Sequence, residues 1–109
     1  MRKRIYISGM RSDGEAFDYT ASLLRDMGAT PINPCQNGLP ADAPAKAHFM
    51  RNMELLWQSD AIYMMREWQK SREASTEAFV AEQIIGLQYL SWKMPMKDLR
   101  NYIEQTPTL

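Results

Sequence analysis

Residues 61–65 read AIYMM, and this short run decides the class of fold. It is almost continuously apolar, which is typical of a strand at the centre of a parallel sheet with both faces covered. A polar loop over residues 66–73 follows it, and a helix begins inside the stretch WQKSREASTEAFVAE at residues 68–82. The helical spacing i, i+4, i+7, i+11 is made by Ala74, Ala78, Ala81 and Ile85. The region therefore predicts a strand, a loop and a helix in that order.

Similar patterns occur on both sides of this unit. Strand patterns lie at residues 3–8, 30–33 and 87–90, and helix patterns lie at residues 15–27, 45–58 and 96–104. Pro31 would confine its strand to a sheet edge or to the first strand position. Strict alternation of strands and helices predicts an α/β fold with right-handed crossovers. We expect a three-layer, Rossmann-like or flavodoxin-like parallel sheet of about four strands, with helices on both faces, in one domain spanning residues 1–109.

Composition excludes several classes of function. The 109 residues are 45% hydrophobic and 10% aromatic, and 13 basic residues balance 13 acidic ones. Without net positive charge, neither a nucleic acid polymer nor an anionic membrane is an expected partner. Cys35 is the only cysteine, so no internal disulfide can form and a cytoplasmic location is expected. No apolar run approaches the roughly 20 residues of a membrane span. His48 stands alone without metal-ligand spacing, so we expect neither a metal nor a cofactor.

Two loops are expected at the ligand-binding edge of the sheet, because ligands bind beyond the carboxyl ends of parallel strands. The first contains Ser8, Gly9, Arg11 and Ser12 and leads into a helix. Backbone N–H groups at such a helix start can hold an anion, and Arg11 adds positive charge. A plain strand–loop–helix junction would have the same composition. The loop matches neither the dinucleotide-binding fingerprint nor the P-loop.

The second loop leads to Glu77, a carboxylate among small residues. If the helix begins near Ala74, Ser71 stands at its entrance and Glu77 lies about one turn in, on the same face as Ala81 and Ile84. This placement predicts a small pocket with a carboxylate in its wall. The simpler interpretation is a charge that stabilises the helix dipole by roughly 0.3–1 kcal/mol. In a pocket, the carboxylate would serve as a nucleophile at a sugar carbon or as a general base.

Three segments taken in order resemble the nucleoside 2-deoxyribosyltransferase-like superfamily. They are IYISGM at residues 5–10, HFMRNMELLWQSDAIYMM at residues 48–65 and WQKSREASTE at residues 68–77. The resemblance covers about residues 4–90. It is nearest to a subgroup of short phage and bacterial proteins related to the deoxynucleoside 5′-monophosphate N-glycosidases.

The resemblance implies roles for individual residues. Glu77 would be the nucleophile that attacks the anomeric carbon, and Tyr6 would orient its carboxylate. Ser71 would contact the 5′-phosphate, with Gly9 and the backbone of Arg11 and Ser12 completing that site. Trp68 would stack on a base or ribose; alternatively, it is a loop aromatic that covers the core.

Asn52 stands where the family segment has an aspartate that assists sugar binding and proton transfer. An amide donates and accepts hydrogen bonds but delivers no proton at neutral pH. The resemblance therefore leaves unassigned the acid that would protonate the departing base.

The function expected from these features is an N-glycosidase or deoxyribosyltransferase acting on a (deoxy)nucleoside or its 5′-monophosphate. The alternatives are a non-catalytic module that binds or sequesters a nucleotide, and an oligomeric structural protein. We also expect a homodimer through helix 45–58, because Phe49, Met50, Met53 and Trp57 are more apolar side chains than so small a domain can cover.

Overall fold

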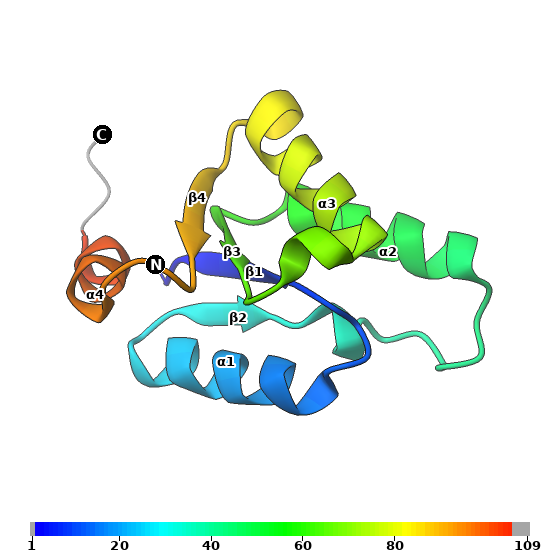
Figure 1. The fold of residues 1–109 in the computed structure, drawn as a ribbon, viewed down its shortest axis with the longest axis horizontal. Helices are drawn as coiled ribbons and strands as arrows, with labels where there is room; N and C mark the ends of the chain where they lie inside the picture. Colours follow the sequence, from blue (N-terminus) through cyan, green and yellow to red (C-terminus); the bar gives the residue numbers. More distant parts are fainter. Residues whose placement is uncertain (1, 106–109) are drawn as a thin grey trace.

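A computed structural model describes residues 2–105 of the chain, in which strands and helices alternate (Figure 1). The strands are β1 (Arg4–Ser8), β2 (Thr30–Ile32), β3 (Ala61–Met64) and β4 (Gln88–Ser91). The α-helices are α1 (Gly14–Asp26), α2 (Ala45–Trp57), α3 (Arg72–Phe79) and α4 (Met96–Glu104). Short helical turns are η1 (Pro34–Gln36), η2 (Trp68–Lys70) and η3 (Val80–Ile85), the last of which continues α3 as a π-helix.

The strands form one parallel sheet in the order β2-β1-β3-β4. The run at residues 61–65 supplies β3, which lies between β1 and β4, and every residue of this strand is buried. The expected α/β fold with a four-stranded parallel sheet is confirmed. The order also brings the ends of β1 and β3 together, since Ser8 is the register partner of Met64.

Helices cover both faces of the sheet, so the molecule has three layers (Figure 1). Because side chains alternate along a strand, Ile5 and Ile7 of β1 pack in the cluster that includes residues of α1 and α4. Tyr6 lies on the opposite face, in the cluster that includes residues of α2 and α3. Ser8 has the same parity as Tyr6 and therefore also faces α3.

β2 is the edge strand that Pro31 predicted. The backbone N–H of Thr30 donates to the carbonyl of Lys3 at 2.8 Å, so the backbone hydrogen-bonding groups of Thr30 point toward β1. Alternate residues of a strand point the opposite way, and Pro31 therefore faces the free edge. The strand ends at Ile32, one residue earlier than expected, because Asn33 instead accepts a hydrogen bond from the N–H of Cys35 at the start of η1.

The helix that carries Glu77 differs from its sequence pattern at both ends. It begins at Arg72, two residues before Ala74, because the Ser71 side chain caps it. Near its end, the N–H of Gly86 donates to the carbonyl of Ala81, a π-type bond that inserts an extra residue into the turn. The expectation that Ile84 shares the face of Glu77 is therefore wrong: Ile84 is 59% exposed.

In residues 2–105, no helix is both long enough and apolar enough to span a lipid bilayer.

Candidate functional site

Glu77 accepts hydrogen bonds from three side chains at the carboxyl edge of the sheet. The Ser71 hydroxyl accepts a hydrogen bond from the N–H of Ala74 at 3.1 Å, which fixes the start of α3. Six residues after this cap, Glu77 faces the sheet and is only 2% exposed. Ala74 and Ala78 on the same side are small, so the helix packs close enough for the carboxylate to reach β1.

Donors from β1 and the loop after it converge on this carboxylate. The Tyr6 hydroxyl donates to Oε2 at 2.6 Å, and the Ser8 hydroxyl donates to Oε1 at 2.6 Å. The guanidinium of Arg11 also donates to Oε2, forming an ion pair, and reaches the Tyr6 oxygen at 3.3 Å and the Gly9 carbonyl at 3.0 Å. Both carboxylate oxygens are therefore held in fixed positions by charged or neutral donors.

Burial and charge act in opposite directions on this group. Burial raises the pKa of the Glu77 carboxyl above its ordinary value of 4.5, while the Arg11 charge and the hydrogen bonds from Ser8, Tyr6 and Arg11 offset part of that rise. Burial, followed by the nearby Glu77 charge, raises the pKa of Tyr6 well above 10.0. The phenol thus stays protonated and acts as a donor to the carboxylate.

A pocket of about 680 Å³ opens beside Glu77. Its walls come from η1, the first two turns of α2 and the first turns of α3, together with Arg11. The lining residues are Arg11, Pro34, Cys35, Ala45, Lys46, His48, Phe49, Asn52, Arg72, Glu73, Thr76 and Glu77. This volume lies within the range of small-molecule sites.

The structure brings together three of the residues singled out in the sequence: Glu77, Arg11 and Asn52 all line the pocket. Tyr6 and Ser8 lie behind Glu77 and act on it through hydrogen bonds. These five side chains form one cluster although they come from three separate segments of the chain.

The other expected site residues lie outside the pocket lining. Ser12 is exposed, and Ser71 is occupied as the helix cap and as a donor to Glu73 at 3.2 Å. Trp68 packs against the apolar cluster under α3, in agreement with the core-covering alternative. Gly9 is needed for packing, since a Cβ there would lie 2.9 Å from Cβ of Met65. The phosphate-binding role of Ser71, Gly9 and Ser12 stays a prediction.

Sequence reasoning missed the wall opposite Glu77. Pro34 and Cys35 come from η1, and Lys46 and His48 come from the start of α2. The sequence feature that pointed to this wall was the long proline-rich segment over residues 34–47, since a loop of that length is often functional. No periodic pattern in the segment indicated its path. Burial raises the pKa of the Cys35 thiol, so this side chain lines the pocket in its neutral form.

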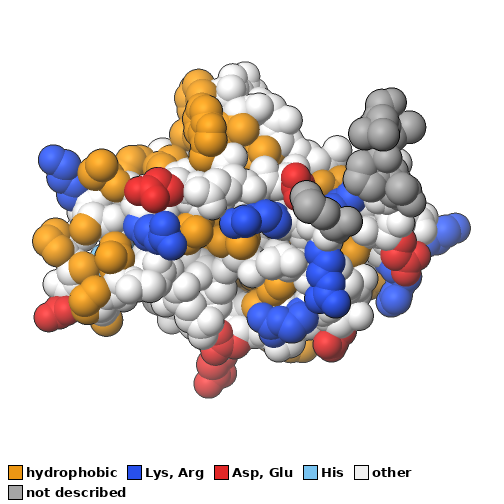
Figure 2. All heavy atoms as spheres, turned by 180° about the vertical axis from the view of Figure 1, so that it is seen from behind, with side chains coloured by type: hydrophobic (Ala, Val, Ile, Leu, Met, Phe, Trp, Pro, Cys, Tyr) orange, Lys and Arg blue, Asp and Glu red, His pale blue; other side chains and the backbone are white. Residues whose placement is uncertain are grey.

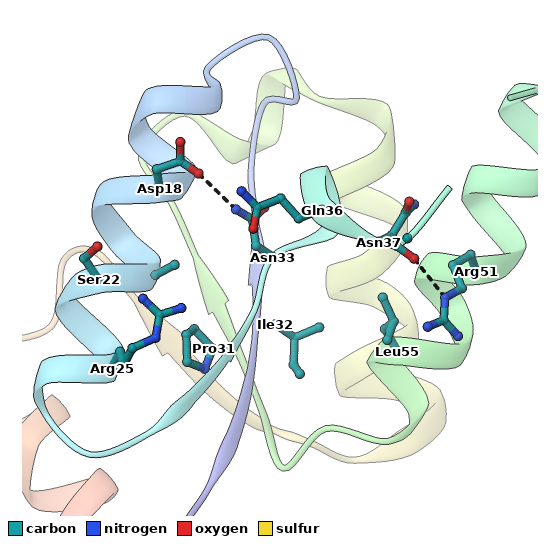
Figure 3. Close-up of a pocket in the computed structure, with 12 residues that line it drawn as sticks. Asp18, Ser22, Arg25, Pro31, Ile32, Asn33, Gln36, Asn37, Arg51 and Leu55 are labelled. Carbon is teal, nitrogen blue, oxygen red and sulfur yellow. Dashed lines mark hydrogen bonds between the residues drawn. The ribbon is translucent and has the colours of Figure 1, made fainter. Parts of the chain in front are cut away.

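A second hollow of about 520 Å³ lies between α1, β2 and α2 (Figure 3). Arg25 and Ser22 approach it from α1, and Arg51 and Leu55 approach it from α2. The Nε atom of Arg51 donates to the carbonyl of Asn37 at 3.0 Å. Asn37 therefore stands between the two hollows, because its side chain bonds to Asn52 in the wall of the larger pocket.

Within residues 2–105, no group of three His, Cys, Asp or Glu side chains is placed to hold a metal ion.

Comparison with known proteins supplies a family. Residues 3–90 match the model of the domain of unknown function DUF4406, and this range extends from β1 to β4 with every residue of the Glu77 cluster inside it. The chain belongs to this family. A search of the curated proteins finds no match. The DUF4406 match covers the sheet, the pocket and α3, but its description assigns no activity to them.

Proposed function

We propose that this DUF4406 protein cleaves the N-glycosidic bond of a (deoxy)nucleoside or its 5′-monophosphate, with Glu77 as the nucleophile. The observation that carries the proposal is a buried carboxylate held by Tyr6, Ser8 and Arg11 in the wall of a 680 Å³ pocket. The ordered resemblance to the nucleoside 2-deoxyribosyltransferase-like superfamily supports the choice of reaction, since Glu77 and Tyr6 are the residues that it pairs.

The chemistry follows from this arrangement. A Glu77 oxygen bonds to the anomeric carbon while the bond from that carbon to the base breaks, and the electron pair of the broken bond leaves with the base. A covalent glycosyl–enzyme intermediate forms through an oxocarbenium-like transition state. Water then releases the sugar in hydrolysis, and a second base releases it in transfer. Tyr6 and Ser8 keep the carboxylate aimed, which supplies the near-attack geometry.

A second candidate function is nucleotide binding without turnover. It is favoured by Asn52, which cannot deliver a proton, and by the ion pair with Arg11, which lowers the nucleophilicity of Glu77. A homodimer through α2 and a cytoplasmic location also belong to the proposal.

Release of free base separates the two candidates. We expect chromatography to detect base released from at least one member of a panel of nucleosides and deoxynucleoside monophosphates. Glu77→Gln keeps the shape of the side chain and removes its charge, so it should lower release by about 10³-fold or more. Glu82→Gln changes an exposed glutamate on the same helical segment and should leave release unchanged. Binding without release from any substrate would favour the sequestering module instead.

A further inference from the structure

Asn37 is a buried amide whose orientation is fixed by a single backbone group. The N–H of Leu39 donates to Oδ1 of Asn37 at 3.0 Å, and Asn37 is 4% exposed. A backbone N–H is never an acceptor, so the amide atom that it meets has to be the oxygen. The opposite end of the amide is therefore the NH₂ group, which carries two hydrogens and accepts none.

The two hydrogens of that NH₂ group have two partners. Nδ2 of Asn37 lies 2.9 Å from Oδ1 of Asn52 and 3.1 Å from Nδ1 of His48. Since Asn37 can only donate here, Asn52 turns its oxygen toward Asn37, and Nδ1 of His48 presents a lone pair. The imidazole hydrogen then sits on Nε2, which lies 3.1 Å from the carbonyl of Pro40, an acceptor that requires a donor. Each donor in this series of hydrogen bonds therefore meets an acceptor.

The network is also held from outside the pocket. The Nε atom of Arg51 donates to the carbonyl of Asn37 at 3.0 Å, as Figure 3 shows at the edge of the second hollow. Asn37 is thus anchored at its side-chain oxygen, its NH₂ group and its carbonyl. Its amide has no alternative orientation that keeps these bonds.

The consequence falls on Asn52, which is 8% exposed and lines the pocket with Glu77. One lone pair of its oxygen is taken by Asn37, and its own NH₂ group is the donor that it can offer to a ligand. His48 lines the same wall, but both of its ring nitrogens are occupied. Toward a ligand, Asn52 therefore offers hydrogen-bond donation by an amide, which gives up no proton at neutral pH.

On the basis of the proposed function, we propose that Asn52 is a specificity-determining residue that donates a hydrogen bond to the departing base without protonating it. The site then favours bases that leave as stable anions, uracil and thymine, over adenine and cytosine. When the glycosidic bond breaks, its electron pair passes to the base nitrogen and spreads onto the flanking carbonyl oxygens. One of these accepts a hydrogen bond from Nδ2 of Asn52, and water protonates the base after it departs.

The first test compares base release from the deoxynucleoside monophosphates of uracil, thymine, adenine and cytosine. The unaltered protein should release uracil and thymine about 10²-fold faster than adenine, the size of a missing general acid. Asn52→Asp still accepts the hydrogen bond from Asn37 and adds a carboxyl group to the pocket that Glu77 lines, where it supplies an acid when protonated. It should raise adenine release by about 10²-fold. The matched control, Asn101→Asp, changes an exposed residue of α4 and should alter neither rate.

Equal release of adenine and uracil by the unaltered protein would overturn the inference and leave the proposed function standing. The same holds if Asn52→Asp fails to raise adenine release. Absence of release by every variant from these four monophosphates and from the corresponding nucleosides would remove the proposed function, and the inference would go with it.

A second test needs no activity. His48 is the only histidine in the chain, so its ring signals in a long-range proton–nitrogen correlation spectrum are unambiguous. In the neutral ring we expect the hydrogen on Nε2 and a lone pair on Nδ1. A hydrogen on Nδ1 would show that Asn37 does not hold Asn52 as described. Asn37→Asp removes both donated hydrogens and should shift the Nδ1 signal.

Discussion

At the scale of single residues, the position of Glu77 combines two opposing demands. A carboxylate that is 2% exposed is poorly solvated, yet three donors surround it, of which Arg11 is positively charged. The donors lie on β1 and the loop after it, so the group is ordered before any ligand enters. Tyr6 and Ser8 both reach it because they are two residues apart on one strand and therefore face the same side.

The raised pKa of Glu77 predicts how stability depends on pH. The folded chain binds this proton more tightly than the unfolded chain does, because burial raises the folded-state pKa above 4.5. Its contribution to stability is therefore fully present below 4.5 and is lost as pH rises through the folded-state pKa. The free energy of unfolding of the unaltered protein, measured relative to that of Glu77→Gln, should therefore fall as pH rises from 4.5 through the folded-state pKa of Glu77.

Urea unfolding of both proteins at a series of pH values measures this difference. Glu82→Gln, which removes an exposed carboxyl group, controls for the change in total charge. A difference that stays constant with pH, or that moves in favour of the unaltered protein as pH rises, would contradict the assignment.

At the scale of elements, the π-turn at η3 sets how α3 meets the following strand. Gly86 adopts φ 79°, a left-handed conformation, directly after η3 and before β4. The carbonyl of Ala81 accepts from the N–H groups of both Gly86 and Leu87 at 2.8 Å. This ending satisfies the carbonyl of Ala81 and leads the chain alongside β3, whose residue Ala61 pairs with Gln88.

Gly86→Ala should therefore destabilise the protein. A residue with a Cβ in the left-handed region costs about 1–2 kcal/mol, and the free energy of unfolding should fall by that amount. Thermal or urea denaturation measures the change. Gly14→Ala is the matched control, because Gly14 lies at the start of α1, has no positive φ and has open space beside it. Equal stability of the two variants would mean that Gly86 does not need this conformation.

At the scale of the whole molecule, the spacing of apolar residues along the sequence was sufficient to predict most of the fold. The apolar run of β3 and the alternation of strands and helices identified the parallel sheet, because those patterns reflect burial on two faces. The same alternation placed the loops after β1 and β3 at one edge, and the family resemblance paired Tyr6 with Glu77. The wall built from residues 34–48 could not be foreseen, since its path depends on tertiary hydrogen bonds such as that between Asn37 and Asn52. The π-turn likewise has no counterpart in a regular helical period.

The outer surface of α2 is the feature that supports a homodimer. Phe49, Met50 and Trp57 are 46%, 57% and 63% exposed, and with Met53 they line a shallow hollow of about 430 Å³. Figure 2 shows hydrophobic side chains gathered at the end of the molecule where α2 lies. Phe49 also lines the pocket of Glu77, so a partner on this surface would lie next to the site.

Sedimentation velocity tests the dimer. We expect the unaltered protein to sediment as a dimer and Trp57→Glu to sediment as a monomer, because a buried unpaired charge opposes association. Tyr19→Glu is the matched control: Tyr19 is 71% exposed on α1, away from this surface, and its replacement should leave the dimer intact. A monomeric unaltered protein would end the dimer proposal.

Pro31 has a consequence for how these molecules behave when crowded together. An unprotected outer strand can recruit a strand from another copy and begin an aggregate. The outward-facing residue of β2 is Pro31, which has a carbonyl but no N–H. An arriving strand would therefore find no hydrogen-bond donor at this position. Pro31 therefore disfavours growth of the sheet from the β2 edge, and a dimer formed through α2 as proposed would keep this protection.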